Sequence, residues 1–82
     1  MKTYFRWTDH AKADLRRIDR QHAIEILRSR TDYANTGVGD VKCLKGSRDL
    51  RLRIGDYRVR FEILEANALR ILQVKHRSEA YR

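Results

Sequence analysis

Two runs of alternating apolar and charged residues, separated by one Gly-Asp pair, constrain the fold of this chain more than any other feature. The runs span residues 50–54 and 57–63, and the pair between them is Gly55 and Asp56. Strict alternation is typical of a strand that is buried on one face. A two-residue connection with glycine first is favoured in a type II′ turn. The sequence therefore predicts a tight β-hairpin.

The two-residue turn determines which residues lie opposite each other in the hairpin. One face is wholly apolar and is expected beneath helices; its pairs are Ile54 with Tyr57, Leu52 with Val59 and Leu50 with Phe61. The other face carries four arginines in opposing pairs, Arg53 with Arg58 and Arg51 with Arg60. Like charges directly across a ladder destabilise it. Because the fold does not require this arrangement, we interpret the arginine face as a binding surface.

Helical periodicity is confined to the N-terminal half. Residues 2–7 mix aromatic and charged side chains and predict a short strand, after which Thr8 is a candidate helix N-cap. Ala11, Leu15 and Ile18 share one stripe of a helix of about residues 9–18. A second helix is predicted from Asp19, with a stripe formed by Ala23, Ile24, Leu27, Thr31 and Ala34. A single bent helix is the alternative.

After a linker at residues 35–40, apolar residues alternate with period two. Strands are predicted at residues 41–44 and 69–76, and a turn at 45–47. If residues 66 and 67 form a second two-residue turn, the last strand continues both faces of the hairpin. Its predicted pairs are Leu72 with Phe61, Val74 with Val59, Gln73 with Arg60, and Lys75 with Arg58. His76 then lies at the rim of the apolar side, near Tyr57. A bulge would reverse this assignment.

Together these elements predict one domain over residues 1–82, of the α+β class. Two N-terminal helices are expected to pack on a four- to five-stranded, mainly antiparallel sheet.

The charge balance indicates a polyanionic partner. The 82 residues include 19 Lys+Arg and 11 Asp+Glu, a net charge of +8, which suits nucleic acid, an acidic protein segment or an anionic surface. No apolar run approaches the roughly 18 residues of a membrane span, and the N-terminus lacks a signal-peptide pattern. Cys43 is the only cysteine and cannot form an intramolecular disulfide. A cytoplasmic protein with no membrane partner is expected.

The sequence contains no pattern for a cofactor or a metal ion. Gly37-Val38-Gly39 lacks the third glycine and the strand-to-helix setting of a nucleotide-binding loop. The histidines, at positions 10, 22 and 76, are scattered along the chain. We therefore expect neither a metal site nor a bound cofactor.

Phosphate is the ligand that the arginine face suits, because guanidinium binds it bidentately and stays charged at every accessible pH. Around Arg58, the candidate RNA- or phosphate-binding residues are Arg51, Arg53 and Arg60. Asp49 and Glu62 are expected opposite each other further along, where they leave the centre of the face positive.

The C-terminus adds the groups that metal-free cleavage of an RNA phosphodiester needs. A base must activate the 2′-hydroxyl, positive charge must stabilise the phosphorane, and the leaving oxygen must receive a proton. An aromatic side chain can also stack a splayed base. The candidate catalytic residues are therefore Arg58, Lys75, His76, Arg77 and Tyr81.

Several of these segments together resemble the RelE/ParE family of bacterial toxins. They are Leu44-Lys45-Gly46, the hairpin from Leu50 to Phe61 with its Gly-Asp-Tyr-Arg-Val core, Val74-Lys75-His76-Arg77 with Tyr81-Arg82, and the early Trp7-Thr8, Ala11 and Leu15. The resemblance covers nearly the whole chain. It implies a microbial RNase-like fold and a cognate antitoxin that wraps an acidic or amphipathic segment over the toxin.

The two branches of this family imply different activities. A RelE-type toxin enters the ribosomal A site and cuts mRNA without metal through 2′-hydroxyl attack, whereas a ParE-type toxin poisons DNA gyrase. In the RelE branch the functional cations would fall on Arg51, Arg58 and Lys75 or Arg77, the stacking or activating aromatic on Tyr81, and a common histidine on His76. By this resemblance, the combined set of Arg58, Lys75, His76, Arg77 and Tyr81 favours an mRNA endoribonuclease over a gyrase inhibitor.

One position departs from the RelE pattern. Asp49 stands where that pattern has a basic residue, which implies weaker activation of the 2′-hydroxyl. A gyrase inhibitor, or a catalytically dead basic binding protein of the same fold, is the alternative reading.

Overall fold

The computed structural model of this chain describes residues 4–43, 49–65 and 68–80. Within these ranges the chain forms three helices and a five-stranded sheet. The elements in chain order are β1 (Tyr4–Trp7), α1 (Asp9–Arg16), α2 (Arg20–Thr36), β2 (Asp40–Cys43), β3 (Leu50–Ile54), β4 (Tyr57–Glu65), β5 (Ala68–His76) and α3 (Arg77–Ala80). The predicted α+β class is confirmed.

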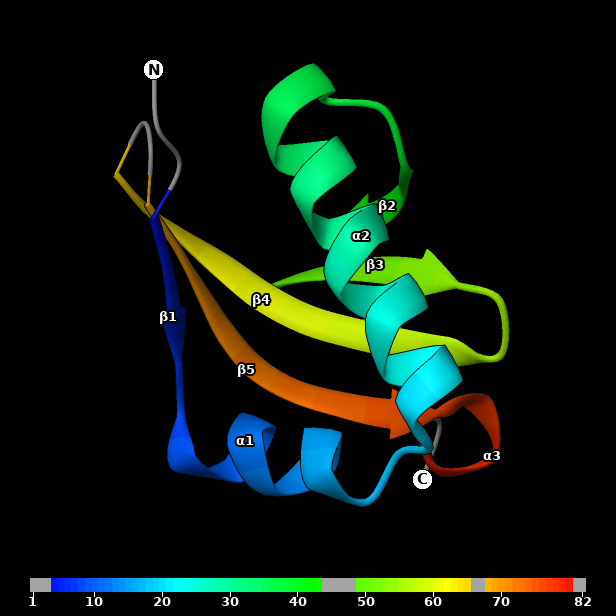
Figure 1. Ribbon diagram of the computed structural model, residues 1–82. Helices are drawn as coiled ribbons and strands as arrows, with labels where there is room; N and C mark the ends of the chain where they lie inside the picture. Colours follow the sequence, from blue (N-terminus) through cyan, green and yellow to red (C-terminus); the bar gives the residue numbers. More distant parts are fainter. Residues whose placement is uncertain (1–3, 44–48, 66–67, 81–82) are drawn as a thin grey trace.

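The strands are arranged in the order β1-β5-β4-β3-β2. β1 runs parallel to β5, and every other neighbouring pair is antiparallel. Figure 1 shows α2 crossing one face of the sheet and α1 lying alongside β5, below the end of β1. The sheet is therefore mainly antiparallel, as predicted, with two N-terminal helices packed against it.

Thr8 caps α1 as predicted, and Asp19, the predicted start of the second helix, caps α2. The Thr8 hydroxyl accepts a hydrogen bond from the third N–H of α1 at 3.1 Å, and the Asp19 carboxylate accepts one from the third N–H of α2 at 3.4 Å. α1 ends at Arg16, earlier than predicted, and α2 ends before Gly37, whose φ of 74° suits a left-handed C-cap. Two separately capped helices exclude the single bent helix.

The buried face of α2 differs from the predicted stripe. Ile26 is fully buried, whereas Ile24 is 45% exposed and Thr31 is also exposed. Ile26 and Tyr33 are seven residues apart, about two helical turns, so they lie on one line that packs into the core. The predicted stripe is offset from this line by part of a turn, and its other members are only half-buried: Ala23, Leu27 and Ala34.

The hairpin of β3 and β4 has the predicted register. The observed pairs are Leu50 with Phe61, Arg51 with Arg60, Leu52 with Val59, Arg53 with Arg58 and Ile54 with Tyr57. In the turn, Gly55 has a φ of 57° while Asp56 keeps a negative φ, which agrees with a type II′ turn.

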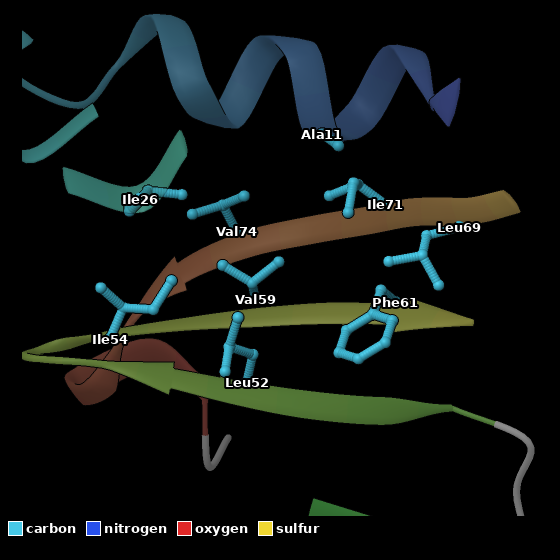
Figure 2. Packing of buried hydrophobic residues seen from close by; sticks show 9 residues of the cluster. All are labelled: Ala11, Ile26, Leu52, Ile54, Val59, Phe61, Leu69, Ile71 and Val74. Carbon is cyan, nitrogen blue, oxygen red and sulfur yellow. The ribbon is translucent and has the colours of Figure 1, made fainter. Parts of the chain in front are cut away.

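The apolar face of this hairpin forms the core together with β5 and the two long helices (Figure 2). The buried cluster consists of Ala11, Ile26, Leu52, Ile54, Val59, Phe61, Leu69, Ile71 and Val74. The core is thin, as expected for a chain of this size.

The register between β4 and β5 follows the prediction at one end and departs from it in the middle. The pairs Tyr57 with His76, Arg58 with Lys75, Val59 with Val74 and Arg60 with Gln73 are confirmed. Phe61, however, lies opposite Ile71, so its predicted pairing with Leu72 is wrong. A bulge at Leu72 shifts the register by one residue, and this keeps both Phe61 and Ile71 buried in the core.

Some predicted boundaries move or cannot be compared. β2 begins at Asp40 rather than at residue 41, and residues 77–80, directly after β5, form the short helix α3. Residues 2 and 3, Leu44, the turn at 45–47 and the turn at 66–67 lie outside the described residues.

Candidate functional site

The side chains of four arginines project from β3 and β4 on the face of the sheet opposite the core, as the register requires. Lys75 of β5 lies opposite Arg58 on the same face. We call Arg51, Arg53, Arg58, Arg60 and Lys75 the cationic face. A cavity of about 120 Å³ opens there, lined by Asp40, Lys42, Arg51, Arg53 and Arg58. The structure therefore brings the predicted phosphate-binding arginines together.

Arg58 occupies the centre of the cationic face and is 8% exposed. Its Nη1 donates hydrogen bonds to the carbonyl oxygens of Gly55 and Tyr57, both at 2.9 Å. No carboxylate among the described residues forms an ion pair with Arg58. The β3–β4 turn therefore fixes the guanidinium in place without neutralising its charge.

Carboxylates approach the other arginines of the face from its margin. Asp49 Oδ2 lies 3.3 Å from Arg60 Nε, and Asp40 Oδ2 lies 3.9 Å from Arg53 Nε. Strand pairing extends as far as Leu50 with Phe61, so the position of Asp49 opposite Glu62 stays a prediction. The Asp49 side chain reaches across to β4, where it offsets the charge of Arg60, and Glu62 accepts a hydrogen bond from Arg70 at 2.8 Å.

Lys75 is held by a buried carboxylate on α1. Its Nζ donates to Asp14 Oδ1 at 3.0 Å, and Arg17 Nη2 donates to the same oxygen at 3.1 Å. Asp14 Oδ2 accepts the backbone N–H of Val74 at 3.0 Å. The ammonium of Lys75 is therefore directed toward α1.

His76 lies at the rim near Tyr57, as predicted. The two rings meet edge to face with centroids 5.5 Å apart. The backbone N–H of Ser78 donates to His76 Nδ1 at 3.2 Å, and the Ser78 hydroxyl lies 3.0 Å from the same atom. Because Nδ1 accepts a hydrogen bond, the neutral ring carries its proton on Nε2.

Arg77 begins α3 and is exposed. Its backbone N–H donates to the Asp56 carbonyl, with 2.6 Å between nitrogen and oxygen, and its Nε lies 4.0 Å from Asp56 Oδ1. The end of β5 is thus attached to the turn that holds Arg58. Tyr81, the predicted aromatic of the site, lies outside the described residues.

Asp14 is the site-supporting residue that sequence reasoning missed. It lies three residues after Ala11 and four before Ile18, within the apolar stripe of the first helix. A carboxylate in the buried stripe of a helix requires a cationic or N–H partner, because burying an unpaired charge is costly. That position was the signal that could have identified it.

A second surface lies between α1, α2 and β1. An apolar groove of about 460 Å³ is lined by Trp7, Lys12, Leu15, Arg16 and Leu27. Beside it, the guanidinium carbon of Arg30 lies 3.7 Å from the ring centroid of Phe5 and 5.4 Å from that of Trp7. Burial lowers the pKa of Arg30. No carboxylate in the described part of the chain pairs with it.

In the described ranges, no group of three or more His, Cys, Asp or Glu side chains is placed to hold a metal ion. None of the helices there is both long and apolar enough to cross a membrane.

Residues 5–81 match the family described as the ParE toxin of the type II toxin–antitoxin system parDE. The chain belongs to this toxin family. No curated protein sequence matches the toxin.

Solved structures of toxin–antitoxin complexes share its fold. The archaeal RelE–RelB complex from Pyrococcus horikoshii matches with a TM-score of 0.77 and 25% identity, covering 98% of the toxin and 100% of that chain. The RelB–RelE complex from Methanococcus jannaschii matches with a TM-score of 0.75 and 21% identity, over 93% and 94% of the chains. The DinJ–YafQ complex from Escherichia coli matches with a TM-score of 0.76 and 11% identity, over 100% of both chains.

Proposed function

We propose that the toxin is an endoribonuclease that cuts mRNA on the ribosome, without a metal ion, in the cytoplasm. The position of Arg58 carries this proposal. Two backbone carbonyls fix its guanidinium at the centre of the cationic face, and no carboxylate of the described residues pairs with it. A fixed, unpaired guanidinium is suited to a phosphate group. The shared fold with RelE structures supports the same reading.

Arg58 and Arg77 are the cations that we assign to the scissile phosphate. Both are tied to the β3–β4 turn, Arg58 through Gly55 and Arg77 through Asp56. Lys75 is the other candidate for the second cation, but its ammonium lies 3.0 Å from the buried carboxylate of Asp14, whereas the carboxylate 4.0 Å from Arg77 Nε belongs to the exposed side chain of Asp56. The flanking phosphates would be bound by Arg51, Arg53 and Arg60.

Tyr81 is the group that we assign to base stacking and proton transfer. The alternative, His76, is the cross-strand partner of Tyr57 on the apolar side of the sheet. Neighbouring residues of a strand point to opposite faces. His76 therefore points away from the face that carries Arg58, and its Nδ1 is already bonded to Ser78.

Replacing Arg58 with methionine tests this assignment. The change keeps most of the volume but removes the charge that would stabilise the phosphorane. We expect the cleavage rate on programmed ribosomes, measured by primer extension, to fall by about 10²- to 10³-fold. Arg58→Lys keeps the charge without the planar fork and should recover only part of the rate.

Arg28→Met is the matched control, because Arg28 is an exposed arginine of α2. Circular dichroism must show that each variant is folded. A folded Arg58→Met protein that cuts at the wild-type rate would remove Arg58 from the mechanism.

We also propose that the groove between α1, α2 and β1 receives an acidic, amphipathic segment of the cognate antitoxin. Its floor is apolar, Lys12 and Arg16 lie in its lining, and Arg30 lies beside it on the rings of Phe5 and Trp7. An apolar strip of the partner would cover the floor while its carboxylates pair with these cations.

Arg30→Ala should weaken antitoxin binding by about 30-fold or more, since a half-buried arginine with a new charge partner is a typical hot spot. Isothermal titration of the toxin with its cognate antitoxin measures this loss. Arg28→Ala, on the same helix but exposed, should bind within a few-fold of wild type. Equal affinities for the two variants would place the antitoxin elsewhere.

Inhibition of DNA gyrase is the second candidate, and the match to the ParE toxin family is the observation that favours it. A supercoiling assay with purified gyrase separates the two functions. Inhibition there, with intact mRNA on ribosomes, would replace the ribonuclease proposal.

A further inference from the structure

The edge of β5 is only partly covered by β1. The parallel pairing of these strands ends where Trp7 meets Ile71, so the later residues of β5 have no strand neighbour on that side among the described elements. Side chains of the α1 segment take the place of a strand there. Thr8 Oγ1 donates to the Leu72 carbonyl at 3.0 Å, and the Val74 N–H donates to Asp14 Oδ2 at 3.0 Å.

Basic side chains also surround the carboxylate of Asp14. Its side chain is 2% exposed, and Lys75 Nζ and Arg17 Nη2 lie 3.0 and 3.1 Å from Oδ1. His10 Nε2 lies 3.4 Å from Oδ2. The side chain of Lys75 is 22% exposed and that of Arg17 is 70% exposed, so water screens the pair with Lys75 less. Lys75 is therefore the principal counterion of the buried carboxylate.

This pairing draws Lys75 away from its neighbours in the sheet. Lys75 is the cross-strand partner of Arg58, and directly opposed side chains share one face. Without Asp14 the ammonium of Lys75 could extend beside Arg58, where it would contact the same RNA backbone. With Asp14 it is directed to the edge of the sheet and its charge is offset.

We propose that Asp14 is a positioning residue that withholds Lys75 from RNA and leaves Arg58 and Arg77 as the cations at the scissile phosphate. This inference rests on the proposed binding of RNA to the cationic face. Asp14 thereby determines how many charges that face offers to the RNA backbone.

The salt dependence of RNA binding tests the inference without cleavage. The probe is a short 2′-O-methyl oligoribonucleotide, followed by fluorescence anisotropy over a range of salt concentrations. Each phosphate contact adds about 0.7 to the slope of log K against log salt for a single strand. Lys75→Met should leave the slope unchanged, whereas Arg53→Met should lower it by about 0.7. A Lys75→Met slope that falls as much as that of Arg53→Met would overturn the inference.

Asp14→Asn supplies the complementary test, because the amide oxygen can still accept the Val74 N–H while the charge is lost. The freed Lys75 should steepen the slope by about 0.7, and the double variant Asp14→Asn/Lys75→Met should return to the wild-type value. An unchanged slope in folded Asp14→Asn would contradict the inference. If Asp14→Asn does not fold, the Lys75→Met comparison decides alone.

Amine labelling separates this inference from the RNA proposal. If neither Arg53→Met nor Arg58→Met changes the slope, the cationic face does not bind RNA and the proposed function fails. Reductive methylation read by mass spectrometry then tests Asp14 directly. In wild type, Lys75 should react severalfold more slowly than the exposed Lys12 and Lys42, and in Asp14→Asn or Asp14→Ala it should react as they do. Equal rates in wild type would show that Asp14 does not hold Lys75.

Discussion

At the scale of single residues, the cations of the toxin differ in their local counterions, and under the proposed function this difference determines which of them can bind a phosphate. Within the described residues, Arg58 donates side-chain hydrogen bonds to two carbonyl oxygens and pairs with no carboxylate, while Arg60 Nε lies 3.3 Å from Asp49 Oδ2. Asp49 therefore subtracts positive charge at one margin of the cationic face. The resemblance to RelE toxins places a basic residue at this position, so Asp49 lowers the charge where that pattern raises it.

Asp49→Lys should strengthen RNA binding. The substitution removes the carboxylate beside Arg60 and adds a cation at the margin of the face. A surface ion pair between the new lysine and a phosphate contributes at most about 1 kcal/mol. We therefore expect the affinity for RNA to rise by up to about fivefold and its salt dependence to become steeper. Fluorescence anisotropy with the same 2′-O-methyl oligoribonucleotide measures both quantities.

Asp32→Lys is the control for net charge, because it changes the charge by the same amount on an exposed position of α2. We expect a larger gain from Asp49→Lys than from Asp32→Lys. Equal gains would mean that the affinity for RNA depends only on the net charge of the toxin.

Side-chain partners were the least predictable part of the site. The four arginines could be assigned to one face because a strand alternates with period two and the two-residue turn fixes the register. The partner of Lys75, in contrast, is Asp14, which lies 61 residues away in the sequence. Such a pair follows from how α1 packs against β5, and no local pattern encodes that packing.

At the scale of secondary-structure elements, charged groups support the start of α2. The Asp19 carboxylate caps the helix and also bonds His22 Nδ1 at 2.6 Å. This side-chain hydrogen bond from His22 is the main reason why the pKa of Asp19 is lowered. A lowered pKa in the folded state means that the ionised cap stabilises the fold at neutral pH.

This contribution should disappear in acid. It is complete above the unfolded-state pKa of about 3.9 and is lost as the pH falls through the lower pKa of the folded state. Asp19→Asn keeps an acceptor at the N-cap but does not ionise. The difference in Tm between wild type and Asp19→Asn should therefore shrink as the pH falls from about 6 to about 2. A constant difference would show that the charge of Asp19 does not stabilise α2.

Features that depend on neighbouring residues in the sequence could be predicted, whereas features that depend on tertiary packing could not. Caps at Thr8 and Asp19 and the turn at Gly55 are local, and the structure has each where the sequence indicates it. The bulge at Leu72 is not local, because it arises where β5 must keep Ile71 in the core. The buried line of α2 likewise depends on how the helix crosses the sheet.

At the scale of the whole molecule, one thin core supports both proposed surfaces. The strand residues of the core belong to β3, β4 and β5, and alternate residues of β3 and β4 carry the arginines of the cationic face. A change on the buried side of these strands therefore affects the toxin through stability, whereas a change on the exposed side affects the site.

Phe61→Ala should destabilise the toxin by about 3–5 kcal/mol, because Phe61 is 2% exposed and a cavity would remain. A small domain has about 5 kcal/mol in total, so the variant should be largely unfolded. Ile63→Ala, at a position of the same strand that is 55% exposed, should cost less than about 1 kcal/mol. Urea unfolding followed by circular dichroism gives both values, and similar losses at the two positions would contradict the described core.

The most direct test of the central claim is to induce the toxin in a bacterial host and map the ends of an abundant translated mRNA by primer extension. We predict cuts within translated codons that disappear when translation is blocked, and no cuts when Arg58→Met is induced. Growth arrest with intact mRNA would contradict the ribonuclease account and support gyrase as the target. Normal growth with intact mRNA would also contradict it, and would leave a basic binding protein of the same fold.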